Sequence, residues 1–201
     1  MSEAKKPDLE NPVQEFVAKR WSPVSFDGRA IDRAELLSIF EAARWAPSAF
    51  NEQPWRYIVA SREDGEAFEA LLSCLVDSNR AWAEHASAVA LGVTANTFAR
   101  NGKTNAYARH DLGLASGQLC AEAAAREVQV HQMAGILPDK AREIYSIPEN
   151  FEAVTALALG YPGENTELDE SIRDRDQQAR SRRPLGATLF GKSWDEPYSQ
   201  N

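Results

Sequence analysis

Residues that bind metals or form disulfides are scarce in this chain of 201 residues, which has two cysteines and three histidines. Cys74 and Cys120 are far apart and belong to no Cys-x-x-Cys pair, and the histidines lack the spacing of zinc ligands. Lone cysteines in helix-like segments are usually small buried hydrophobic residues. We therefore expect reduced, structural cysteines and no metal site.

Long apolar runs are also missing. No stretch approaches the roughly 20 apolar residues that a membrane-spanning helix needs. The first residues, MSEAKKPDLENP, lack the apolar segment of a secretion signal. We expect a cytoplasmic protein without a membrane partner.

The usual catalytic signatures are absent. The chain has neither a GxGxxG dinucleotide-binding fingerprint nor a phosphate-binding P-loop. The run from Gly113 to Gly117 resembles a hydrolase nucleophile elbow only superficially, because it lies inside a predicted helix and has the wrong spacing. If the chain is an enzyme, a bound cofactor is expected to carry the chemistry.

Positive charge is in deficit, since 22 Lys and Arg residues face 30 Asp and Glu residues, a formal net charge of −8. An acidic chain does not attract nucleic acid as a whole, so we expect no nucleic-acid partner. The basic residues nevertheless gather near the end of the chain, at Arg173, Arg175, Arg180, Arg182 and Arg183. Such a cluster on an acidic protein raises the question of which anion it binds.

What the sequence does contain is an alternation of helix-like and strand-like segments. This pattern favours one layered domain over residues 12–201, after a flexible tail over 1–11. The polar segment 95–107 is expected to be mobile. Strands are expected at 55–60, 87–94, 128–131 and 154–160, and helices at 12–20, from Asp32 to the stop at Pro47, and at 64–77, 80–86, 108–127 and 138–145.

Three separated segments carry groups that suit a phosphorylated, planar ligand. In 19–26 a cation and hydroxyl groups follow the first helix, although this segment alone is better explained as a solvated helix end. The stiff polar loop 46–55 can present amides and hydroxyls to a planar heterocycle, or it is an ordinary turn beside a core tryptophan. In 180–185, Arg180 and Arg182 would lie on one side of an extended chain and clamp a phosphate, or form a disordered basic stretch.

In this order the segments resemble the FMN-dependent nitroreductase family, over about residues 16–194. The specific part is the middle loop, Ala43-Arg-Trp-Ala-Pro47-Ser48-Ala-Phe-Asn51-Glu-Gln53-Pro54-Trp55. The weaker matches are Arg20-Trp-Ser22, Asp111-Leu-Gly-Leu, His131-Gln132-Met133-Ala134-Gly135, Gly160-Tyr-Pro162 and Arg180-Ser-Arg182-Arg-Pro184.

The resemblance implies an α+β fold, in which helices wrap a mixed central sheet in three layers, and an intertwined homodimer with FMN at its interface. The flavin N5 carries the chemistry, so no catalytic side chain is expected. Phe50 and Trp82 are expected on the substrate side. The implied cofactor contacts are Arg20, Trp21 and Ser22; Arg180 and Arg182 at the phosphate; Asn79 at the ring edge; Ala134 and Gly135 near N5; and Pro47, Ser48, Ala49, Asn51 and Gln53 on a loop from the partner.

Two positions depart from the family pattern. Val24 stands where many members have Lys or Arg, and Trp82 stands where some have Lys. Those cations would stabilise negative charge on the reduced ring, so their loss would lower the reduction potential of the flavin or weaken its binding. Lys19 and Arg80 are the candidates to replace them.

The activity that the resemblance implies is transfer of electron pairs from NAD(P)H to a nitroaromatic, quinone or other conjugated acceptor, by a ping-pong mechanism. One alternative is a flavin carrier or sensor with little turnover. Another is a non-enzymatic interaction module that uses the C-terminal arginines. Gly113 and Gly117, one helical turn apart, suit close backbone packing within the chain or between subunits, and Phe190 and Trp194 are candidates to dock on the partner.

Overall fold

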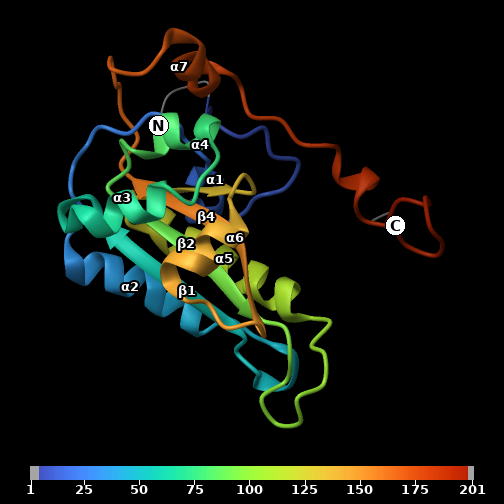
Figure 1. Ribbon diagram of the computed structural model, residues 1–201. Coiled ribbons are helices and arrows are strands. Elements are labelled where there is room, and N and C mark those ends of the chain that lie inside the picture. The colour runs from blue at the N-terminus through green and yellow to red at the C-terminus, as the bar shows by residue number, and fades with distance from the viewer. Residues whose placement is uncertain (1–4, 199–201) are drawn as a thin grey trace.

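A four-stranded sheet forms the centre of the molecule, for which a computed structural model describes residues 5–198 (Figure 1). Along the sheet the order is β1-β2-β4-β3, and each neighbouring pair is antiparallel. The α+β class is therefore confirmed. The strands are β1 Trp55–Ser61, β2 Ala88–Ala95, β3 Gln129–Met133 and β4 Phe151–Gly160.

Mixed strand pairing was expected, and for the described residues this expectation is wrong. β2 and β3 do run in the same direction, because each is antiparallel to β4. They are not neighbours. Because β4 lies between them, β2 and β3 do not form the parallel pair that a strand-helix-strand crossover usually forms.

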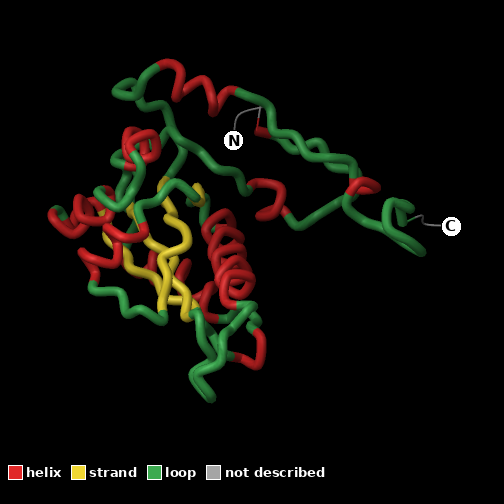
Figure 2. The backbone as a smooth tube through the Cα atoms, turned by 45° about the vertical axis from the view of Figure 1, so that its right-hand side comes forward, coloured by secondary structure: helices red, strands yellow, loops and turns green. Residues whose placement is uncertain are grey.

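Helices cover both faces of the sheet and give the expected three layers (Figure 2). Side chains alternate along each strand, so β2 sends Val89 and Leu91 to one core cluster and Ala88 and Ala90 to the other. The first cluster packs against α3, α4 and α6, and the second against α2 and α5. The helices are α1 Glu15–Lys19, α2 Arg33–Arg44, α3 Glu66–Leu72, α4 Asp77–Ala83, α5 Ala108–Ala125, α6 Pro138–Tyr145 and α7 Glu170–Gln177.

The helix ends follow local rules in most places. Asp32 caps α2 by accepting a hydrogen bond from the Ala34 amide, as its position before the helix predicts. Glu35 does not complete a capping box there, because its carboxylate accepts a hydrogen bond from the Tyr161 hydroxyl. α1 starts later than expected, after Gln14, and is one short helix of five residues.

Residues 178–198 leave the body as an arm, and the N-terminal segment from Lys5 to Glu10 runs beside the first part of it (Figures 1 and 2). Lys5 donates to the carbonyl of Gln178, and the Leu185 amide donates to the carboxylate of Glu10. Part of the expected flexible tail is therefore fixed by hydrogen bonds, whereas residues 1–4 lie outside the described range.

No helix within residues 5–198 is long and apolar enough to cross a membrane.

Candidate functional site

Residues 20–26, after α1, are held in place through their backbone. The Trp21 amide donates to Gln129 Oε1 over 2.9 Å. The Asp176 carboxylate accepts the amides of Val24 and Ser25, at 3.0 and 2.8 Å. These anchors fix the backbone and leave the side chains of Arg20 and Ser22 in contact with each other, with Nη1 3.4 Å from Oγ.

His131 adds a further anchor from β3. Its Nδ1 lies 2.7 Å from the carbonyl oxygen of Pro23, which can only accept, so Nδ1 carries the hydrogen. Burial lowers the pKa of His131, because the charged imidazolium is disfavoured away from water. The ring packs against Trp82 in a tilted arrangement, with 4.5 Å between centroids and 36° between planes, and joins the 20–26 segment to α4.

Three arginines lie near one another beside this segment, close enough for the charges of Arg20 and Arg182 to act on Arg180. Arg180 donates to the carbonyl oxygens of Arg20 and Ala18, at 2.6 and 2.7 Å, and its buried Nε has no hydrogen-bond partner in the structure. Burial, and then the charges of Arg20 and Arg182, lower the pKa of Arg180. Within the described residues, no carboxylate forms an ion pair with any of the three.

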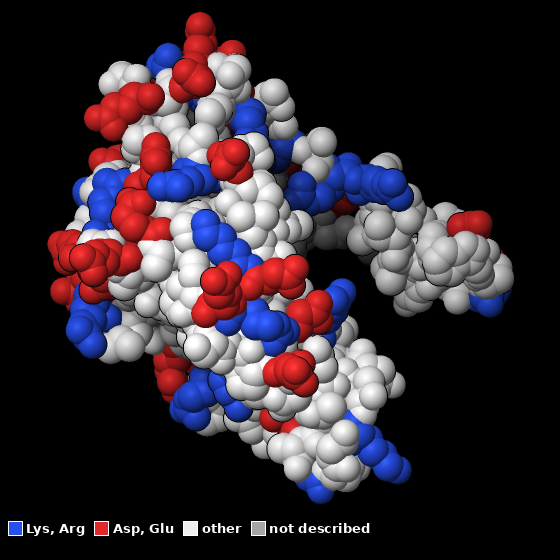
Figure 3. Space-filling model, in the orientation of Figure 1, with Lys and Arg blue, Asp and Glu red and all other residues white. Residues whose placement is uncertain are grey.

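Neighbouring cations without a counter-ion repel one another, and an anion between them would relieve that repulsion. Planar guanidinium groups suit phosphate oxygens, because they donate in pairs. Figure 3 shows Lys and Arg side chains gathered where the arm leaves the body. We call Arg20, Ser22, Arg180 and Arg182 the arginine corner.

Asn79 and Gly135 meet on the same side of the sheet as Trp82. The Asn79 amide nitrogen donates to the Gly135 carbonyl oxygen over 3.1 Å. A Cβ on Gly135 would lie 2.6 Å from that nitrogen and 2.7 Å from Val76 Cγ2, so only glycine fits. Ala134, beside it, is exposed. Gly135 therefore lets Asn79 and Val76 pack directly on the backbone, and Ala134 is the exposed position beside them.

Trp82 does not lie where the substrate side was expected. Its side chain is fully buried in the core cluster with Val24 and Phe26. The structure contradicts the prediction that it contacts a substrate, because no part of the ring reaches the surface. Its Nε1 is buried and has no hydrogen-bond partner among residues 5–198.

The two candidate replacement cations are already paired. Lys19 lies 2.7 Å from Glu15, and Arg80 lies 3.2 Å from Glu69. Both pairs are on exposed helix surfaces.

The loop 47–53 is rigid and strained. Phe50, Asn51 and Gln53 have φ angles of 57°, 56° and 50°, in the left-handed region that side chains other than glycine rarely adopt. The hydroxyl of Ser48 accepts the Gln53 amide. Strain of this kind persists where the surrounding contacts enforce it, which is common at ligand sites.

The predicted contacts fall into two groups at opposite ends of the molecule. The loop 47–53 precedes Trp55 at the start of the edge strand β1, whereas Trp21 contacts Gln129 at the start of the opposite edge strand β3. A seven-residue strand spans roughly 20 Å. Figures 1 and 2 both place the loop and α1 far apart. One chain therefore cannot bring both groups to a single small ligand.

Sequence reasoning missed two carboxylates that hold these parts, the buried Asp111 and the half-buried Asp176. Asp111, which is 1% exposed, accepts the Ala49 amide over 3.1 Å. Asp176, which lies inside the arginine run, accepts the amides of Val24 and Ser25. Gln129, His131 and Asp176 had no role assigned, although an acid among five arginines was a signal that could have been followed.

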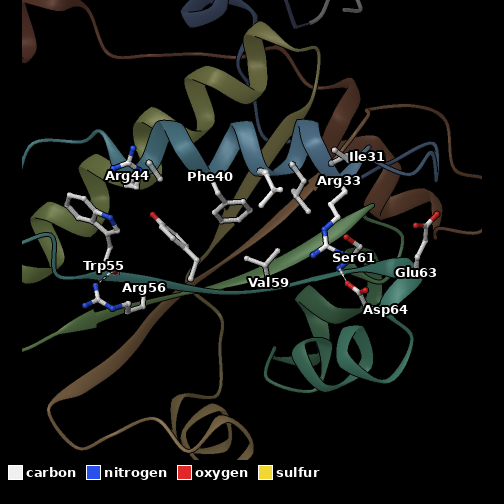
Figure 4. Close-up of a pocket in the computed structure, with 14 residues that line it drawn as sticks. Ile31, Arg33, Phe40, Arg44, Trp55, Arg56, Val59, Ser61, Glu63 and Asp64 are labelled. Carbon is white, nitrogen blue, oxygen red and sulfur yellow. Dashed lines mark hydrogen bonds between the residues drawn. The ribbon is translucent and has the colours of Figure 1, made fainter.

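A separate groove of about 600 Å³ lies between α2 and β1 (Figure 4). Phe40, Trp55, Tyr57 and Val59 form its apolar wall. Because β1 is an edge strand, its outer backbone groups border this groove. None of the predicted cofactor residues lines it.

The outer face of α5 is not covered by any other part of the described chain at Gly113 and Gly117. Gly113 and Gly117 are exposed, and a Cβ at either would meet nothing within 4 Å. Of the two readings of these glycines, packing within the chain is therefore excluded for the described residues. A hydrophobic side chain, Leu114, is exposed beside them.

Comparison with known proteins gives a consistent result. The model of the family described as "Nitroreductase family" matches residues 17–161. The chain belongs to the nitroreductase family. A solved structure described as "the oxidoreductase containing FMN" is 30% identical, superposes with a TM-score of 0.88, and matches over 96% of this chain and 98% of the other.

Two curated relatives match the chain in sequence. An uncharacterized 15.4 kDa protein of Mycolicibacterium smegmatis is 33% identical over 132 residues, 66% of this chain and 87% of the relative. A putative NADH dehydrogenase/NAD(P)H nitroreductase of Streptomyces coelicolor is 40% identical over 67 residues, which are 33% of this chain and 32% of the relative.

Proposed function

We propose that this protein is an FMN-dependent oxidoreductase that takes electron pairs from NAD(P)H. The observation that carries the proposal is the arginine corner, with three guanidinium groups and no carboxylate from the described residues between them. A phosphate dianion matches this charge and geometry. The similar FMN-containing oxidoreductase and the relative named as an NAD(P)H nitroreductase support the choice of cofactor and donor.

The residues present fit FMN. Arg20, Ser22, Arg180 and Arg182 would hold its phosphate, and the unpartnered Nε of Arg180 offers one more donor. Asn79 would face the ring edge, and the backbone at Gly135 and the exposed Ala134 would lie near N5. Trp21 contributes through its anchored backbone, because its side chain is buried.

Bound FMN would supply two-electron chemistry between the donor and a nitroaromatic, quinone or other conjugated acceptor. The chain's own residues bind and orient it: the arginine corner fixes one end and the rigid backbone beside Asn79 fixes the other. Donor and acceptor would use the same face in turn, in a ping-pong cycle. No side chain is assigned as an acid, since water can deliver the protons.

The active form is proposed to be a homodimer. The loop 47–53 cannot reach the arginine corner of its own chain, so a second copy would have to supply it. The bare face of α5 suits close contact between two copies. The apolar arm residues suit the groove beside β1, because Leu189 and Trp194 are 44% and 82% exposed in the single chain.

The test of function starts with purified protein loaded with FMN under anaerobic conditions. We expect NADPH or NADH to bleach the flavin absorbance and a quinone or nitro compound to restore it. Arg180→Ala with Arg182→Ala should abolish FMN retention, whereas Arg126→Ala, which removes an exposed arginine paired with Glu122, should not. If the melting temperature is the same with and without FMN, the proposal is overturned, because a bound ligand must stabilise the native state.

A flavin carrier with little turnover is the second candidate. It is favoured by the burial of Val24 and Trp82 at the two positions where family members carry cations, and by the pairing of Lys19 and Arg80 elsewhere. Tight FMN binding without steady oxidation of NAD(P)H would identify it.

A further inference from the structure

The segment 97–104 is an ordered hairpin rather than the mobile stretch that its composition suggests. Thr97 and Thr104 form a β-bridge, and the Phe98 amide donates to the Lys103 carbonyl over 2.8 Å. Gly102, at φ +68°, closes the turn and donates to the Phe98 carbonyl. The tip thus has a defined position at the lower end of Figure 1.

This hairpin is joined to the strained loop 47–53. The Ala99 amide donates to the carboxylate of Glu52. The rings of Phe50 and Phe98 pack edge to face, with 5.8 Å between centroids and 80° between planes. The hairpin and the loop therefore form one rigid projection, although about 50 residues of sequence separate them.

Arg100 lies on top of this projection. Its guanidinium carbon is 4.2 Å from the centroid of the Phe50 ring and 5.3 Å from that of Phe98. Phe50 is itself 71% exposed, so the stack stands in solvent. Among the described residues, no carboxylate forms an ion pair with Arg100 or Lys103. Figure 3 shows Lys or Arg side chains at this lower tip of the molecule.

The aromatic stack orients this cation without neutralising it. A cation over a ring face keeps its full charge and its donors, in contrast to one held by a carboxylate. An unpaired arginine is notable on a chain with a formal net charge of −8, because the overall field repels anionic ligands. A local cation at the mouth of a site offsets that repulsion.

We propose that Arg100 is a specificity residue that binds a phosphate group of the nicotinamide dinucleotide donor. The inference rests on the proposed function, in which loop 47–53 reaches the flavin of the partner subunit. Arg100 is attached to that loop through Phe50, so it stands at the entrance above the ring. A donor whose nicotinamide lies on the flavin extends its phosphates away from the ring, toward such an entrance.

Two phosphate sources in the donor share this chemistry, the pyrophosphate and the 2′-phosphate of NADPH. Arg100→Gln removes the charge and keeps a hydrogen-bonding side chain, and Arg100→Lys keeps the charge. Arg29→Gln is the matched control, because Arg29 also stacks on a ring, that of Tyr161 at 4.0 Å, but is paired with Asp27 at 2.7 Å.

The measurement is the second-order rate of anaerobic flavin bleaching in the FMN-loaded protein. Three donors are compared: NADPH, NADH and a benzylated dihydronicotinamide that carries no phosphate. We expect Arg100→Gln to lower the NADPH rate by about tenfold or more, as loss of a charge-assisted hydrogen bond predicts. The rate with the phosphate-free donor should be unchanged, and Arg100→Lys should recover part of the loss.

The pattern across donors identifies the phosphate. A loss confined to NADPH assigns the 2′-phosphate, and an equal loss for NADPH and NADH assigns the pyrophosphate. Unchanged rates for both, or an equal loss with the phosphate-free donor, would overturn the inference. If none of the three donors bleaches the wild-type flavin, the proposed function itself fails and this inference falls with it.

Discussion

Asp176 accepts the backbone amide of Ser25 over 2.8 Å, across 151 positions of sequence. The same carboxylate accepts the Val24 amide. Through these two bonds α7 fixes the segment that presents Arg20 and Ser22. The arginine corner thus depends on an acidic residue that never contacts its ligand.

Asp176→Ala is expected to lower both stability and FMN affinity. Two amides lose their acceptor, which costs about 2 kcal/mol of unfolding free energy. Chemical denaturation measures this loss, and FMN titration measures the weaker binding. Asp174→Ala removes an exposed acid from the same helix and serves as the control. Equal effects of the two substitutions would contradict the anchoring role.

His131 gives the fold a pH dependence in the acidic range. Burial lowers its pKa in the folded state below the ordinary value of 6.5, and the Arg175 charge acts in the same direction. The backbone bond to Pro23 and the Asp176 charge oppose it. The folded state therefore binds fewer protons than the unfolded state, so stability is present above pH 6.5 and is lost as pH falls through the lowered pKa.

His131→Asn tests this dependence, because an amide nitrogen can take the place of Nδ1 without titrating. Unfolding free energies from denaturant titrations between pH 7 and 5 should fall more steeply for the wild type than for the variant. Parallel curves would show that His131 does not account for the slope.

Substitution by alanine should change the stability of the protein in opposite directions at Gly135 and at Gly113. Gly135→Ala pushes a Cβ against Asn79 and Val76, so we expect lower stability and loss of FMN. In Gly113→Ala the added Cβ meets no other part of the described chain within 4 Å, and in a helix the substitution should raise the unfolding free energy by up to about 1 kcal/mol. If α5 faces a second copy, the added methyl should instead weaken the dimer, which sedimentation at graded concentrations would detect.

Trp82 should behave as a core residue. Its Nε1 has no partner in the structure, so Trp82→Phe loses no hydrogen bond and should be mild. Trp82→Ala should cost about 4 kcal/mol, as truncation of a buried aromatic side chain does. Neither should alter the preference among acceptors. A changed acceptor preference in a stable Trp82→Phe protein would restore the substrate-side assignment.

Residues that start, cap or stop helices predicted the ends of α6 and the start of α2 from the sequence. Pro138 and Tyr145 bound α6 as expected, and the Asp32 cap was found by its position. The missed helix α7, Glu170–Gln177, buries none of its residues, so it lacks the apolar periodicity that reveals a helix. Its place is set by Asp176 and by Lys5, through contacts that span most of the chain.

For the candidate site, residue types were easier to predict than their surroundings. The residues of the arginine corner, and Asn79 and Gly135, could be named from motifs, and the structure places Arg180 beside Arg20 and Asn79 beside Gly135. Their roles toward a cofactor stay predictions. Trp82 was misjudged because a motif position does not reveal burial. Arg100 went unnoticed because its partners, Phe50 and Phe98, become neighbours only when two loops pack together.

The separation of loop 47–53 from the arginine corner has a genetic consequence. Suppose that each site takes its loop from one copy and its arginines from the other. A chain with defective arginines and a chain with a defective loop then damage different halves of the site. Expressed together, they would form mixed pairs in which one site combines both lesions and the other combines neither. Two inactive alleles would then restore part of the activity that each lacks alone.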